Sequence, residues 1–254
     1  MEVEGRAAIV TGGGTGVGRA TARRLAGLGC SVCVNYSRSR EGALAVVAEA
    51  EAAGVKAIAV QADVSRDADC RRLVAEAERA FGRLDVLVNN AGTTRFIPHA
   101  DLDAVTDEDW TAILGVNLKG PFQCTRAARP LLEASGSAEV VMVSSVAGIV
   151  GIGSCIPYCA SKAGLNNLVL TLARVLGPAI RVNGVAPGFI DGEWLQQGLG
   201  GAYEAVKGAM LAKSPLNAVC TPDDVADAIL SLVTGSDLVT GHVLPVEGGM
   251  LLGG

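Results

Sequence analysis

The sequence predicts an α/β fold: a doubly wound, seven-stranded parallel sheet with helices on both faces. Short apolar runs alternate with segments of helical periodicity almost to the end of the chain, and this alternation is typical of βαβ units. The apolar runs are continuous, as expected of strands that are buried on both faces. The 254 residues are enough for one large domain and few for two.

Seven segments are expected to be strands and six to be helices. The strand candidates are Ala7–Thr11, Ser31–Tyr36, Lys56–Gln61, Val86–Asn89, Glu139–Ser144, Arg181–Ala186 and His242–Pro245. The helix candidates are Gly18–Leu28, Glu41–Ala53, Asp67–Phe81, Asp107–Glu133, Pro157–Leu176 and Pro222–Val233. Pro157 and Pro222 suit the first turn of a helix. One irregular insertion, Gly188–Lys213, is expected to be either a mobile lid over a ligand or an amphipathic surface segment.

Composition excludes several classes of function. The net charge is −5 and no basic cluster stands out, so we expect no nucleic-acid partner. No apolar stretch reaches the roughly 18 residues of a membrane helix, and no signal peptide is visible. We therefore expect a cytoplasmic protein that does not bind membranes.

Cysteine and histidine do not form the patterns of metal or redox sites. The seven cysteines are scattered and are expected to be reduced thiols. Cys30 and Cys33 have a redox spacing, but positions three apart in a strand point to opposite faces. The two histidines lie far apart in the sequence, without a ligand cluster, so we expect no metal site.

A glycine-rich turn follows the first predicted strand. Gly12, Gly16 and Gly18 have the spacing G-x-x-x-G-x-G. A turn without Cβ atoms lets the backbone approach a pyrophosphate, and the N-terminus of the next helix supplies N–H groups and the positive end of a dipole. We expect the phosphates of a dinucleotide to bind at Gly12, Gly14, Thr15, Gly16, Val17 and Gly18.

The end of the second strand bears on the choice of cofactor. An enzyme that uses NAD usually has an acid there, which binds the ribose 2′-hydroxyl, whereas this chain has Tyr36, Ser37 and Arg38. The absence of a carboxylate removes repulsion against a 2′-phosphate, and Ser37 and Arg38 offer donors and charge. The sequence therefore favours NADP(H) over NAD(H), although Arg38 could also be a solvated surface charge.

Tyr158 and Lys162 are the candidate catalytic pair. They lie four residues apart in a predicted helix, on one face, where a lysine ammonium would lower the pKa of the phenol. Ser145 precedes Tyr158 by 13 residues, at the carboxyl end of the fifth strand, where open α/β sheets bind ligands. Its hydroxyl could hold a substrate oxygen, although Ser144 could face the pocket instead.

Together, these motifs resemble those of the classical short-chain dehydrogenase/reductase family over essentially the whole chain. The resemblance implies a Rossmann fold in which residues 1–254 form one dinucleotide-binding and catalytic domain and residues 188–213 form a substrate-binding lid. It also implies hydride transfer without a metal. The matching motifs are Thr11-Gly12-x-x-x-Gly16-x-Gly18, Asp63-Val64, Asn89-Asn90-Ala91-Gly92, Asn117, Ser144-Ser145, Tyr158-x-x-x-Lys162 and Pro187-Gly188.

The resemblance assigns a role to each motif. Tyr158 would be general acid in reduction and general base in oxidation, and Lys162 would also hold the nicotinamide ribose. Ser145 would orient the reacting oxygen, and Asn117, at a local break in its helix, would anchor a water linked to Lys162. Gly192 stands where many relatives have threonine. Further cofactor contacts would come from Asp63, Val64, Asn90, Ala91, Gly92, Pro187, Gly188 and the backbone of Ile190.

The resemblance favours an NADP(H)-dependent reductase of ketones, similar to 3-oxoacyl-thioester reductases. The alternatives are a sugar or other alcohol dehydrogenase, and a non-catalytic regulator, which should have lost a catalytic side chain. A trans-enoyl reductase would space its tyrosine and lysine more widely. The small-molecule pocket would be mostly apolar, with walls at residues 94–96 and 154–156, and Arg95 could pair with an acidic substrate or be a plain exposed charge. A homotetramer would use the helices at 107–133 and 157–176.

Overall fold

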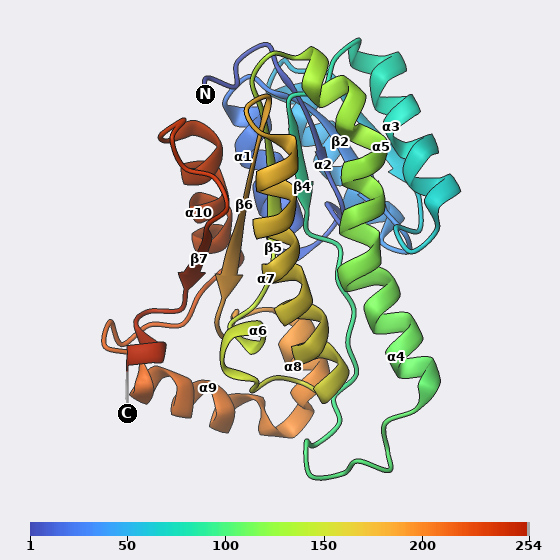
Figure 1. Ribbon diagram of the computed structural model, residues 1–254. Coiled ribbons are helices and arrows are strands. Elements are labelled where there is room, and N and C mark those ends of the chain that lie inside the picture. Colours follow the sequence, from blue (N-terminus) through green and yellow to red (C-terminus); the bar gives the residue numbers. More distant parts are fainter. Residues whose placement is uncertain (253–254) are drawn as a thin grey trace.

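Seven parallel strands form one sheet in the computed structural model, which describes residues 1–252 (Figure 1). Their order is β3-β2-β1-β4-β5-β6-β7, and every neighbouring pair is parallel. The predicted fold class is confirmed. The strands are β1 (Ala7–Val10), β2 (Ser31–Tyr36), β3 (Ala57–Gln61), β4 (Val86–Asn89), β5 (Ala138–Val143), β6 (Ile180–Pro187) and β7 (Val243–Val246).

Helices cover both faces of the sheet. One face packs against α1 (Gly16–Gly27), α2 (Arg40–Ala52) and α10 (Pro222–Thr234), and the other against α3 (Asp67–Phe81), α5 (Gly120–Ala134) and α7 (Ile156–Leu176). Successive residues of a strand point into opposite layers, as Ile9 and Val10 do. Cys30 and Cys33 likewise lie in different layers, so their spacing does not form a redox pair.

The predicted helix at 107–133 is interrupted. It consists of α4 (Asp107–Leu114), the π-helical turn η1 (Gly115–Lys119) and α5. Asn117 lies in the π-helical turn and is fully buried. A π-helical turn inserts an extra residue into the helix and is often found at functional sites, and it provides the local break expected at Asn117.

The sequence led us to expect an irregular insertion at 188–213. The structure shows regular helices there instead. The insertion forms α8 (Glu193–Leu199), a short 3₁₀ turn η2 (Gly200–Ala202) and α9 (Tyr203–Lys213). Glycines at 192, 198, 200 and 201 interrupt the apolar spacing that would have revealed these helices. Figure 1 places α8 and α9 below the carboxyl ends of the strands, near the short helix α6 (Ala147–Val150). The last element, η3 (Met250–Leu252), is a 3₁₀ turn.

The order of the strands creates a crevice at the carboxyl edge of the sheet. Strands β1 and β4 are neighbours, while the chain continues from β1 outward to β2 and from β4 outward to β5. Ligands of open α/β sheets bind at such a switch point. Residues 1–252 contain no helix that is long and apolar enough to cross a membrane.

Candidate active site

The glycine-rich turn leaves the N-terminus of α1 open. Within residues 1–252, no side chain caps this helix and its first turn holds no acid. Gly12 and Gly16 have φ values of +61° and +50°, a region that favours glycine. A methyl group on Gly18 would lie 2.3 Å from the carbonyl oxygen of Gly12, so only glycine allows the turn to pack this closely on the helix. The turn and the free N–H groups fit a pyrophosphate.

Asn35 holds this turn in place, and the sequence analysis missed it. Its Oδ1 accepts from the N–H of Gly12 at 3.2 Å, and its Nδ2 donates to the carbonyl of Ala62 at 3.0 Å. The side chain is buried in β2, where a buried amide needs partners. A single amide within an apolar strand was the signal that could have identified it.

A second set of hydrogen bonds joins the loops after β1 and β4. The hydroxyl of Thr11 accepts from the N–H groups of Asn90 and Ala91 at 2.9 and 3.0 Å. Asn90 Nδ2 donates to the carbonyls of Thr11 and Gly12. The loop that begins with Asn90 therefore lies beside the glycine-rich turn, at the place where the family resemblance implies a contact with the cofactor.

The tip of β2 carries a positive charge. Tyr36 is buried, whereas Ser37, Arg38 and Arg40 are exposed. Beside this tip is a hollow of about 550 Å³, lined by Ser37, Ala59, Val60, Gln61, Ala62, Asp63, Asp69, Arg72 and Glu76. Asp63 accepts from the backbone and hydroxyl of Ser65. Val64 is buried, and its carbonyl accepts from Gln123 Nε2 at 2.9 Å, so its side chain is not available to a ligand there.

Tyr158 and Ser145 meet at the carboxyl edge of the sheet. Tyr158 lies in the first turns of α7, and the Ser145 hydroxyl is near enough to the phenol to lower the pKa of Tyr158 against the effect of burial. Ser144 points the other way and donates to Asn166 Oδ1 at 2.5 Å. The structure therefore places Ser145, and not Ser144, beside the phenol.

Burial dominates the titration of the catalytic pair. It raises the pKa of Tyr158 to about 12, against the opposing effect of the Ser145 hydrogen bond, and lowers the pKa of Lys162 to about 8. Lys162 Nζ donates to the carbonyl of Val143 at 2.8 Å and lies 5.6 Å from the centre of the Tyr158 ring. The expected lowering of the pKa of Tyr158 is therefore wrong for this structure, because burial of the phenol outweighs the effect that lowers its pKa.

Asn117 is fixed close to Lys162. Its Oδ1 accepts from the N–H of Thr93 at 2.8 Å, and its Nδ2 donates to the carbonyl of Thr93 and to the hydroxyl of Ser161. A methyl group on Gly92 would lie 3.7 Å from Asn117 Oδ1 and 4.0 Å from Lys162 Nζ. The π-helical turn, α7 and the loop after β4 therefore meet at one point.

Two segments form a fixed wall beside Tyr158. The hydroxyls of Thr94 and Ser154 lie 2.5 Å apart, and the N–H of Ile97 donates to the carbonyl of Ser154 at 2.9 Å. Arg95 Nη1 lies 2.9 Å from both carboxylate oxygens of Asp109. Because this charge is already balanced, Arg95 is not free for an acidic substrate.

The end of β6 leaves backbone groups available. Gly188 pairs with Val246, and Phe189 and Asp191 pair with Cys220. This pattern leaves the N–H and C=O of Ile190 without backbone partners among the described residues. A methyl group on Gly192 would touch nothing within 4 Å. The space that the threonine of many relatives would fill is therefore not taken by another of the described side chains. Residues 1–252 contain no group of His, Cys, Asp or Glu that could hold a metal ion.

Comparison with known proteins identifies the family. The family model described as enoyl-(acyl carrier protein) reductase matches residues 12–251. A crystal structure of a short-chain dehydrogenase/reductase from Burkholderia xenovorans superposes with a TM-score of 0.90 at 40% identity, covering 98% of both chains. The chain belongs to the short-chain dehydrogenase/reductase family. This confirms the resemblance drawn from the motifs, and it makes the chain an oxidoreductase.

Curated members of this family include reductases of acyl substrates. Ketoacyl reductase 2 of the granaticin polyketide synthase from Streptomyces violaceoruber is 47% identical over 97% of this chain and 96% of its own. The 3-oxoacyl-[acyl-carrier-protein] reductase of Staphylococcus aureus is 37% identical over 97% and 98%. A family member with another substrate is also similar: the NAD⁺-bound structure of a xylitol dehydrogenase has a TM-score of 0.89 at 27% identity, covering 98% of this chain and all of its own.

Proposed function

We propose that this enzyme reduces a ketone with NADPH, with Tyr158 as the proton donor. The observation that carries the proposal is that the Ser145 hydroxyl lies near enough to the Tyr158 phenol to lower its pKa, next to the crevice where β1 meets β4. When bound, the nicotinamide supplies the hydride. The ketone oxygen would sit between the two hydroxyls, so that Ser145 holds the oxygen and Tyr158 donates a proton to it.

Tyr158 is in the protonation state that a proton donor needs. With a pKa of about 12, the phenol keeps its proton at neutral pH and can give it to an oxygen that gains negative charge. The nearby charge of Lys162 would favour the phenolate that remains. Asn117 would hold the loop at Thr93 in place beside Lys162. A proton that Tyr158 gives up could be replaced at this point.

The tip of β2 supports NADPH over NADH. Ser37, Arg38 and Arg40 are exposed there and form a set of donors and charges for a 2′-phosphate. The other cofactor contacts proposed are the backbone of the glycine-rich turn (residues 12–18) with the pyrophosphate, Asp63 and Val64 with the adenine, residues 90–92 with the adenosine, and residues 187–190 with the carboxamide.

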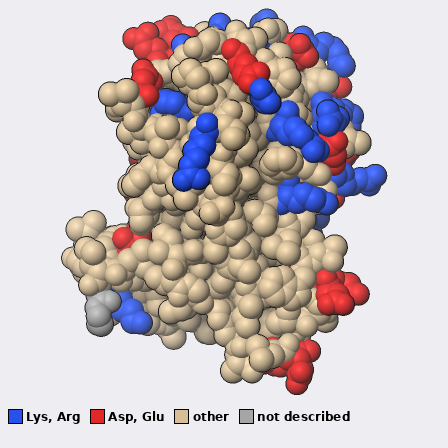
Figure 2. Space-filling model, viewed as in Figure 1, with Lys and Arg blue, Asp and Glu red and all other residues tan. Residues whose placement is uncertain are grey.

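A polyol dehydrogenase is the second candidate, because a xylitol dehydrogenase has the same fold over its whole length. The walls near Tyr158 favour the ketone instead. Phe96 and Trp194 are apolar, Arg95 is paired with Asp109, and few charged side chains appear over the lower half of the molecule in Figure 2, where α6, α7 and α8 lie in Figure 1. Two aromatic rings and a paired charge offer a sugar few hydrogen bonds.

The test is consumption of NADPH and NADH against 3-oxoacyl thioesters, simple ketones, sugars and quinones. We expect turnover of oxo compounds with NADPH. Replacing Tyr158 with phenylalanine should abolish turnover and leave NADPH binding nearly unchanged, which fluorescence titration measures. Turnover that survives in the Tyr158→Phe variant would disprove the role of the phenol. Tight NADPH binding without turnover of any compound would favour the non-catalytic regulator.

We further propose that residues 188–213 act as the substrate lid of one domain spanning residues 1–254, and that the enzyme is a cytoplasmic homotetramer. Its seven cysteines are free, buried thiols, which a reducing compartment preserves. The proposed subunit contact is a groove of about 450 Å³ between η1 and α7, lined by Thr111, Leu114, Gly115, Leu118, Lys119, Phe122 and Leu168.

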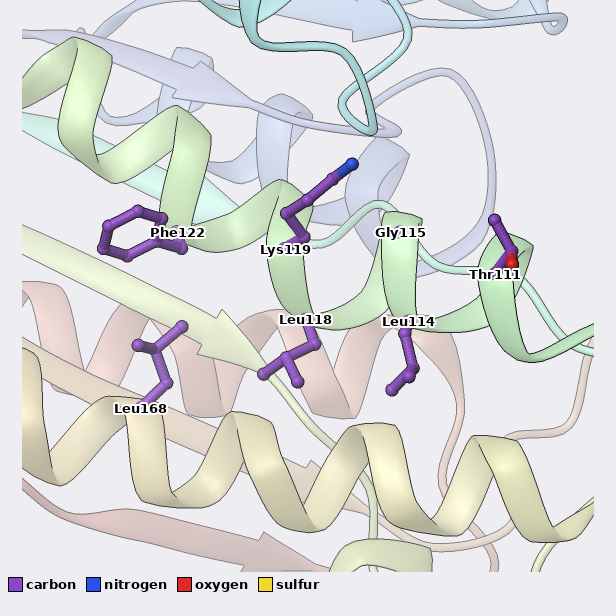
Figure 3. Close-up of a pocket in the computed structure, with 7 residues that line it drawn as sticks. All are labelled: Thr111, Leu114, Gly115, Leu118, Lys119, Phe122 and Leu168. Atoms are coloured by element: carbon purple, nitrogen blue, oxygen red, sulfur yellow. The ribbon is translucent and has the colours of Figure 1, made fainter.

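In Figure 3, Leu118 and Leu168 point toward each other across this groove, while Lys119 points away. Phe122, Leu170 and Val175 add exposed apolar surface on α5 and α7, which monomers rarely leave uncovered. Light scattering of the wild type should give the mass of four chains, and of Phe122→Asp a smaller mass. A monomeric wild type would disprove the tetramer.

A further inference from the structure

We propose that Phe96 and Trp194 form an aromatic slot over Tyr158, and that this slot selects ketones carrying a flat aromatic ring next to the carbonyl chain. The proposal rests on the proposed function, because it names the substrate class of the same site. It concerns side chains of the wall and the lid, and not the proton-transfer groups.

Three aromatic side chains of this chain meet at the site, and two more pack against each other in the lid. The sequence has only four phenylalanines, three tyrosines and two tryptophans. Five of these nine residues lie in the wall, the catalytic helix and the lid: Phe96, Tyr158, Phe189, Trp194 and Tyr203. The core elsewhere consists mainly of alanine, valine, leucine and isoleucine, so the need for apolar packing does not by itself explain this concentration.

Trp194 links the catalytic tyrosine to the wall. The centre of its indole lies 6.3 Å from that of the Tyr158 ring and 6.5 Å from that of the Phe96 ring, with an interplanar angle of 69° to Phe96. These are the separations and tilts of edge contacts between aromatic rings. In such contacts the edge of one ring meets the face of another, so the surface left for a further ring is the exposed part of the Trp194 indole.

Trp194 is also unusually exposed for so large an apolar side chain. It is 48% accessible although it touches two other rings, and Tyr158 beneath it is buried. An exposed apolar side chain at the mouth of a site is surface that a ligand can cover. A flat ring entering toward Tyr158 would cover the indole and keep its carbonyl group near the Ser145 and Tyr158 hydroxyls.

Gly198 lets the lid sit directly on Phe96. It lies one helical turn after Trp194 in α8, on the same side of the helix. A methyl group on Gly198 would lie 1.9 Å from Cε2 of Phe96, so the phenyl ring occupies the space where any other residue would have its side chain. Because Gly198 has no side chain, the Phe96 ring packs directly on α8, and this contact sets its position relative to Trp194.

Both sides of the slot are held from outside. The wall is joined to residue 154 by the hydrogen bonds of Thr94 and Ile97. On the lid, Asp191 accepts from the hydroxyl of Tyr203 and from Lys207, whose Nζ lies 2.5 Å from its carboxylate. The slot is therefore formed before the substrate arrives, which lowers the entropic cost of binding a rigid ring.

The test compares two ketones with the same carbon skeleton, 4-phenyl-2-butanone and 4-cyclohexyl-2-butanone. They have similar apolar area and differ in the flat π-face. We expect kcat/KM with NADPH to favour the phenyl ketone by about 3- to 10-fold, the range of aromatic pair energies. Trp194→Leu should reduce this ratio to about 1, and Trp194→Phe should retain most of it.

Three controls separate the slot from other causes. Trp110→Phe changes the other tryptophan, on α4, and should leave the ratio unchanged. It also leaves Trp194 as the only tryptophan, whose fluorescence the phenyl ketone should quench more strongly than the cyclohexyl ketone. Gly198→Ala should displace the Phe96 ring and lower the ratio even if Trp194→Leu fails to fold.

The outcomes distinguish this inference from the proposed function. A wild-type ratio near 1, or a ratio that Trp194→Leu and Gly198→Ala leave intact, would overturn the slot. Turnover of the N-acetylcysteamine thioester of 3-oxobutanoate together with a ratio near 1 would overturn the slot alone. Failure to turn over this thioester and both ketones would overturn the proposed function.

Discussion

Replacing Glu139 with glutamine tests how much stability the enzyme loses by burying a carboxylate in its sheet. Glu139 lies in β5 and has no accessible surface. Its Oε1 accepts from Asn183 Nδ2 at 3.0 Å. Arg181 Nη1 is 2.8 Å from Oε2, but its N–H groups donate to the carbonyls of Leu232 and Val239. The ion pair is therefore made without a hydrogen bond.

Burial outweighs this ion pair and raises the pKa of Glu139 to about 7, compared with about 4.3 in an unfolded chain. Because the folded state binds the proton more tightly, this residue contributes stability fully below about pH 4, and the contribution is lost as the pH rises to about 7. The shift corresponds to about 4 kcal/mol in total, of which about 2 kcal/mol is lost between pH 5.5 and 8.

Urea unfolding of the wild type and of Glu139→Gln at several pH values measures this loss. The amide keeps the acceptor for Asn183 and cannot ionise, so the variant should gain about 2 kcal/mol relative to the wild type from pH 5.5 to 8. Glu133→Gln, an exposed position on α5, should follow the wild type. Parallel stability curves for wild type and Glu139→Gln would refute the reasoning.

Three further predictions concern the site. Gly18→Ala places a methyl group 2.3 Å from the Gly12 carbonyl, and it should weaken NADPH binding at least about tenfold in calorimetry while circular dichroism stays unchanged; unchanged affinity would contradict the close packing. Arg38→Ala should raise the Kd of NADPH about tenfold and leave that of NADH alone in fluorescence titration; equal losses would argue against a 2′-phosphate contact. Because burial lowers the pKa of Lys162 to about 8, kcat for reduction should fall as the pH rises through about 8, and a flat profile would contradict a role for the ammonium.

The sequence by itself determined the fold class and the family, and it predicted the positions of the candidate site residues along the chain. Buried parallel strands need continuous apolar runs, and a phosphate turn needs glycine, so both requirements are visible in the order of residues. The spacing of Tyr158 and Lys162 likewise follows from the period of one helix.

Only the tertiary structure decided how these residues act on one another. The pKa of Tyr158 depends on burial and on the neighbouring Ser145 hydroxyl, and Asn35 supports the glycine turn from another strand. The contact between Gly198 and Phe96 joins segments about a hundred positions apart in the chain. Such effects depend on distance and burial in space, because fields, hydrogen bonds and packing act between neighbours in space and not between neighbours in sequence.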